Sequence, residues 1–134
     1  MKKTIHLTVA SLGLLSASLL SPLTQAETIN YHCTYTHASY TAPFMKTPGT
    51  RNCPEGRCSY DVVINGAQGS INGVSGFDVF QSESQIVLGR TARDPIMGGM
   101  DTATLTIQKS DMSFVGVKET TPSVVLTTKG SCTQ

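Results

Sequence analysis

The sequence predicts an all-β fold, a small antiparallel barrel or, as the alternative, a sandwich. From residue 27 onward the chain consists of short apolar runs separated by glycine and asparagine turn signals. No window of this part shows apolar residues at helical spacing over three turns. All four cysteines of the chain also lie here. Many short strands joined by glycine-rich turns, with cysteines to close them, are typical of small barrels and sandwiches.

Residues 1 to 26 have the three parts of a secretory signal peptide. Lys2 and Lys3 precede an apolar run of about 16 residues from Ile5 to Leu20, and small residues follow up to Ala26. A bilayer span needs about 20 apolar residues, so we expect cleavage after Ala26 rather than a membrane anchor. Cys33 lies too far from this cut to be a lipid acceptor. The expected product is soluble and either periplasmic or secreted.

The remaining residues, 27–134, are enough for a single domain with one core. They hold eight basic and nine acidic residues, which gives a net charge near −1. Partners such as nucleic acid or an anionic membrane select for a basic excess on one face. We therefore expect neither as a partner.

The first expected strand, Thr28 to Tyr40, alternates between apolar and polar side chains. Ile29, Tyr31, Cys33 and Tyr35 share one face, which is the expected buried face. Ala42 to Arg57 follows, contains three prolines and two glycines, and shows no period. We expect a long loop there, and loops of that length are often functional.

The cysteines predict two disulfides, because an even count in a small exported domain is most simply fully paired. Cys53 and Cys58 flank a short segment with Pro54 and Gly56, which suits a tight turn and a local bridge. Cys33 is then left with Cys132. This second bridge closes a loop of about 100 residues, for which chain entropy predicts roughly 4 to 5 kcal/mol of stabilisation.

Six further strands are expected, which makes about seven in all. They are Tyr60 to Ile64, Val74 to Phe80, Gln85 to Gly89, Thr102 to Gln108, Ser113 to Lys118 and Ser123 to Thr128. Turns are expected at Asn65-Gly66 and Asn72-Gly73, since Asn-Gly is a strong hairpin signal. A bridge between the first strand and the chain end favours the barrel, because closure places the first and last strands side by side.

Catalytic chemistry has few candidates in this sequence. Only His32 and His37 could act as bases in the expected domain, and their odd separation places them on opposite faces unless a bulge intervenes. The segment around Ser75 lacks the spacing and the strand-to-helix context of a nucleophile elbow. The cysteines favour disulfides over zinc in an oxidising compartment. We expect neither an enzyme nor a cofactor.

Two features of the segment from Arg90 to Asp101 suggest binding. Met97 and Met100 are thioethers three residues apart, and soft sulfur ligands suit Cu(I), so a copper site is one alternative. Arg90 and Arg93 lie beside Asp94 and form a local positive spot that could hold an acidic group of a partner. These four basic and thioether residues are the candidate binding residues.

The Tyr-x-Cys pattern of Tyr31-His32-Cys33 on the first strand resembles that of the small periplasmic lysozyme-inhibitor barrels of the membrane-bound, C-type-specific kind. The resemblance implies a barrel and, as an alternative function, inhibition of a cell-wall hydrolase. That family's inhibitory motif is a Ser-Gly followed shortly by a tyrosine. Here Ser75-Gly76 is followed by Phe77 and no tyrosine, so no inhibitory residue is carried over.

The function that the sequence favours is therefore binding, to another exported protein or to a small ligand in the barrel mouth. We expect the recognition surfaces to be Ala42 to Arg57 and Arg90 to Asp101, because loops on a rigid scaffold commonly carry recognition. The alternatives are a hydrolase inhibitor and a periplasmic copper-binding protein. A purely structural subunit is the remaining class.

Overall fold

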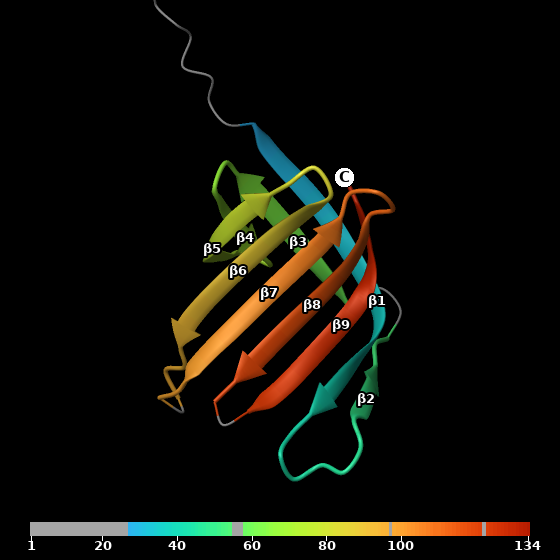
Figure 1. Ribbon diagram of the computed structural model, residues 1–134, viewed down its shortest axis with the longest axis vertical. Helices are drawn as coiled ribbons and strands as arrows, with labels where there is room; N and C mark the ends of the chain where they lie inside the picture. The colour runs from blue at the N-terminus through green and yellow to red at the C-terminus, as the bar shows by residue number, and fades with distance from the viewer. Residues whose placement is uncertain (1–26, 55–57, 97, 122) are drawn as a thin grey trace, which may run out of the picture.

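The computed structural model describes residues 27–134 except 55–57, 97 and 122, and shows a closed antiparallel β-barrel (Figure 1). The predicted signal segment lies outside the described residues. In the part that the structure describes, no helix is long and apolar enough to cross a membrane. The all-β barrel predicted from the sequence is confirmed.

Nine strands build the fold, and eight of them form the barrel. Their bounds are β1 Thr28–Thr41, β2 Gly49–Asn52, β3 Ser59–Asn65, β4 Gln68–Ile71, β5 Val74–Gln81, β6 Gln85–Arg93, β7 Met100–Gln108, β8 Ser113–Thr120 and β9 Val124–Thr133. Each strand from β3 to β8 pairs with the next one along the chain, and β1 pairs with both β3 and β9. The β1–β9 pairing closes the barrel.

Two strands lie where the sequence predicted none, so the structure has nine strands where about seven were expected. β2 lies within the predicted loop Ala42 to Arg57 and pairs with β1 from His37 to Tyr40. Its four residues are mostly exposed and carry no apolar alternation, so hydropathy could not reveal it. β4 is the short run between the two predicted turns. The turn at Asn72-Gly73 has positive φ at both residues, which is the geometry that Asn-Gly favours.

One edge of β1 serves two partners in succession. β3 covers this edge from Thr28 to Thr34, and β2 covers it from His37 to Tyr40. Cys53 and Cys58 lie at the two ends of the connection from β2 to β3, and the backbones of both are hydrogen-bonded to this edge. The Cys53 amide donates to the Thr36 carbonyl at 2.9 Å, and the Tyr35 amide donates to the Cys58 carbonyl at 3.0 Å.

Both predicted disulfides are present. Cys33 and Cys132 are direct cross-strand partners on β1 and β9, so their bridge lies at the seam that closes the barrel. Cys53 and Cys58 bridge the ends of the segment between β2 and β3. The pairing that the sequence favoured is therefore confirmed.

Inward-facing side chains fill the barrel in rows that run across neighbouring strands. One row contains Ile86, Ile107, Phe114 and Gly130, and the next contains Leu88, Leu105, Gly116 and Thr128. Thr128 is the buried polar residue of the described chain. Its hydroxyl donates to the Gly116 carbonyl at 3.4 Å and accepts from the Tyr60 hydroxyl at 3.2 Å. The core is thus apolar with one satisfied hydroxyl pair.

Candidate functional site

One end of the barrel collects the long connections. β1, β6 and β8 end there, and β2, β7 and β9 begin there, because neighbouring strands run antiparallel. Figure 1 shows these connections together at the lower end of the molecule. We call this the loop end. It contains part of each of the two segments that the sequence predicted to carry recognition.

Two large apolar side chains at the loop end project into solvent. Phe44, between β1 and β2, is 86% exposed, and Ile96, between β6 and β7, is 88% exposed. Exposing such large apolar side chains to water is unfavourable, and covering them with a partner would therefore stabilise a complex. The sequence analysis named the segments but not these two residues, since hydropathy alone does not separate a projecting residue from a core residue.

The Ile96 loop is held in place by its own backbone and by Asp94. The Asp94 carboxylate accepts the Ile96 amide at 2.7 Å, and the Asp94 amide donates to the Gly99 carbonyl at 2.7 Å. The Arg93 guanidinium donates to the Gly98 carbonyl at 3.5 Å. Arg93 therefore helps to fix the loop that presents Ile96.

A groove of about 560 Å³ lies between β1, β2, β8 and β9 at the same end. Tyr40, Val124 and Leu126 supply apolar surface to it, and Arg51 and Lys118 supply positive charge. No acidic side chain of the described residues lines this groove. The groove is therefore apolar and basic.

The barrel mouth opens at the loop end as well. A cavity of about 110 Å³ lies inside it, walled by residues such as Tyr60, Phe77 and Leu105. A second recess of about 350 Å³ lies further out and includes Arg90 and Asp101. Phe77, Ala103 and Lys118 line both spaces, so the two adjoin.

The structure describes three of the four candidate binding residues. Arg90 lies on β6 and lines the outer recess of the mouth, as does Arg93. Met100 is half-exposed at the start of β7, opposite Arg93. Met97 lies outside the described residues, so a copper site with Met100 stays a prediction. Among the residues described, no group of three or more His, Cys, Asp or Glu side chains could hold a metal ion.

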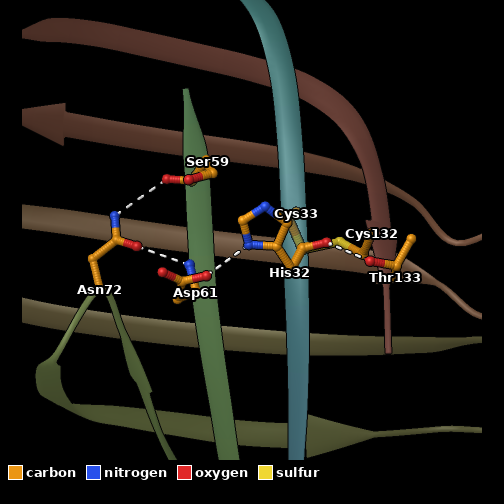
Figure 2. A network of polar contacts seen from close by, with 7 residues as sticks. All are labelled: His32, Cys33, Ser59, Asp61, Asn72, Cys132 and Thr133. Carbon is orange, nitrogen blue, oxygen red and sulfur yellow. Dashed lines mark hydrogen bonds and ion pairs between the residues drawn. A yellow bond between two sulfur atoms is a disulfide. The ribbon is translucent and has the colours of Figure 1, made fainter. Parts of the chain in front are cut away.

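Away from the loop end, on the outer surface, His32 and Asp61 form an ion pair (Figure 2). His32 Nδ1 donates to Asp61 Oδ1 at 2.7 Å. The Asp61 amide in turn donates to the side-chain oxygen of Asn72 at 2.8 Å. No hydroxyl of the described chain is hydrogen-bonded to the other ring nitrogen of His32, so this base lacks a bound nucleophile.

The expectation that His32 and His37 lie on opposite faces is wrong. The pairing of β1 with β9 shifts register between Tyr35 and Ala38, which is a bulge. Cys33 before the bulge and Ala38 after it are both buried, so the histidine before each of them faces outward. His37 Nδ1 is hydrogen-bonded to the Thr36 hydroxyl at 3.1 Å. The sequence analysis had allowed for such a bulge as the exception to the alternation of faces along the strand.

Phe77, which follows Ser75-Gly76, is only 5% exposed and packs in the core. It offers no projecting side chain for a hydrolase cleft. Comparison of this chain with protein-family models, with curated proteins and with solved structures finds no match.

Proposed function

We propose that this protein is a non-enzymatic, exported binding protein that docks another exported protein on its loop end. The observation that carries the proposal is the exposure of Phe44 and Ile96 on two separate loops of that end. Large apolar anchors in the centre of an interface commonly supply most of its binding energy. The closed barrel beneath them provides a rigid support, which limits the entropy lost on binding.

The groove at the same end of the barrel indicates the chemistry of the partner. Tyr40 and Leu126 would contact apolar side chains, while Arg51 and Lys118 would face acidic ones. The partner surface that fits is therefore an apolar centre with an acidic border. Basic residues at an interface border act mainly on the association rate, which then falls with added salt.

Export is supported by two features. The disulfides persist in oxidising compartments such as the periplasm or the extracellular space. The first 26 residues have the charged, apolar and small-residue parts of a secretory signal. We therefore place the partner in the same compartment.

The test is affinity purification from an envelope extract, followed by binding titration of the purified partner. We expect Phe44→Ser and Ile96→Ser together to weaken the complex at least 100-fold, because buried anchors are each worth about 2 kcal/mol or more. The control is Phe80→Ser. Phe80 faces outward near the end of β5 that lies away from the loop end, and it is 69% exposed. An unchanged affinity of the double variant, or an equal loss in the control, would contradict the proposal.

A further inference from the structure

The inward-facing row at the barrel mouth places two cations on either side of a small residue. Arg90 on β6 and Lys118 on β8 are both direct cross-strand partners of Ala103 on β7. Adjacent strands lie about 4.8 Å apart, so the backbones of the two basic residues are about 10 Å apart. Both side chains line the outer recess together with Ala103, and the Arg90 side chain extends toward Gly76 on β5. This arrangement suits one carboxylate held from two sides.

The cavity behind this row is apolar and small. Tyr60, Ile71, Phe77 and Leu105 wall it, and its volume is about 110 Å³. An apolar cavity of about 150 Å³ accommodates benzene. The present cavity therefore fits a smaller group, such as a branched aliphatic chain of about four carbons.

Asp101 lies two residues from Ala103 along β7, at the next inward position toward solvent. Its Oδ1 is buried, and no group of the described chain is hydrogen-bonded to it. Neither Arg90 nor Lys118 forms an ion pair with it, although all three line the same recess. A carboxylate oxygen without a partner is unfavourable, and the Asp101 side chain lines the recess, so a donor that enters the recess and reaches this carboxylate would gain free energy there.

We propose that the barrel mouth binds a small zwitterion, an α-amino acid with a branched aliphatic side chain. Its carboxylate lies between Arg90 and Lys118, its ammonium group donates to Asp101, and its side chain enters the apolar cavity. A simple organic anion would leave Asp101 without a donor, and a simple amine would leave the two cations without an acceptor. The zwitterion matches all three charges and the cavity together.

The first test is calorimetric titration of the purified protein with L-leucine and three relatives that each lack one part. These are 4-methylpentanoate without the ammonium group, 3-methylbutylamine without the carboxylate, and glycine without the side chain. We expect L-leucine to bind at least tenfold more tightly than each of the three. No detectable heat with L-leucine at millimolar concentration, or equal affinity for any of the three, would overturn the proposal.

Two variants then assign the contacts. Asp101→Asn is expected to weaken L-leucine at least tenfold and to leave 4-methylpentanoate unchanged, while Arg90→Gln is expected to weaken both. Lys109→Gln, in the turn after β7 at the other end of the barrel, is the matched control. If Asp101→Asn weakened both ligands alike, or neither, Asp101 would not be the ammonium partner and the proposal would fail.

Lys118 and Leu126 line both the mouth and the groove, but variants of other residues separate the two functions. Arg90 and Asp101 do not line the groove between β1, β2, β8 and β9, so their variants test the mouth alone. The Phe44 and Ile96 variants should in turn bind L-leucine normally. Loss of ligand binding in those variants would show that the mouth is not an independent site, and would count against the inference.

Discussion

At the scale of single residues, Tyr35 shows how the barrel interior changes the behaviour of a side chain. Its ring stacks on Tyr60 with the centroids 5.1 Å apart and meets Phe114 edge-on at 6.4 Å. Burial disfavours the charged phenolate, and the neighbouring Tyr60 adds to the effect, so the pKa of Tyr35 is raised above its ordinary value. The folded protein thus holds this phenol neutral in alkali more strongly than the unfolded chain does.

This shift predicts a pH dependence of stability. Because the folded pKa lies above the unfolded one, the contribution is fully present below about pH 10 and is lost as the pH rises through the folded pKa. We expect the free energy of unfolding to fall with pH above 10, and to fall less steeply in Tyr35→Phe. Urea unfolding at several alkaline pH values measures this. An identical slope in the variant would mean that Tyr35 does not contribute.

Residue patterns predicted part of the candidate site. Arg90 and Arg93 were found because two arginines beside an aspartate form a recognisable charged cluster. Lys118 and Asp101 were missed, although both continue the inward alternation of their strands past the last buried position. A charge at an inward position near a strand end is a signal for a barrel mouth. It can be used only after the strands are known to close.

At the scale of elements, glycine at one inward position of β8 leaves room for a side chain of β9. A Cβ at Gly116 would lie 2.5 Å from the Thr128 hydroxyl oxygen and 3.5 Å from both Leu105 and Tyr60. The hydroxyl pair of Thr128 and Tyr60 occupies that space instead. The absence of a side chain at Gly116 therefore allows the Thr128 hydroxyl to be buried in this row.

We expect Gly116→Ala to destabilise the protein by about 1 to 3 kcal/mol, as overpacking of a core does. Gly89→Ala on β6 is the matched control, since a Cβ there would meet nothing within 4 Å. That control should be neutral or stabilising by up to about 1 kcal/mol, because alanine lowers the entropy of the unfolded chain. Urea unfolding of both variants decides the matter, and equal effects would refute the assigned role of Gly116.

The elements differ in how well the sequence predicted them. Strands with apolar alternation, such as β1 and β7, were predicted within a few residues because one face is buried along most of their length. β2 was missed because its pairing with the exposed end of β1 buries little apolar surface. The register shift within β1 also left no trace in the hydropathy pattern. Backbone pairing without burial is invisible to such patterns.

At the scale of the whole molecule, the disulfides predicted the architecture before any strand was placed in space. A bridge between the first strand and the end of the chain is satisfied by a closed barrel, and the structure has this closure. The sequence could not place Phe44 or the apolar and basic groove, because these depend on which strand ends meet.

Loop length predicts unequal contributions from the two bridges. Cys33 and Cys132 are 99 residues apart, and removing their bridge should cost about 4 to 5 kcal/mol. Cys53 and Cys58 are 5 residues apart, and removing theirs should cost about 2 kcal/mol by the same chain-entropy relation. Serine pairs at each bridge, compared by urea unfolding, provide the test. A larger loss at the short bridge would contradict the entropic account.

The β1–β9 seam also constrains how the chain can fold as it is made. β1 is the first strand of the barrel to emerge, yet the partner for one of its edges is the last, so that edge stays unpaired until synthesis is nearly complete. Contacts between such distant segments are slow to form, and an open strand edge can pair with other chains. The nascent protein therefore passes through a stage in which all its other strands are present but aggregation competes with closure. Shielding of β1 during that interval would matter more to the yield of folded protein than any local feature of the barrel.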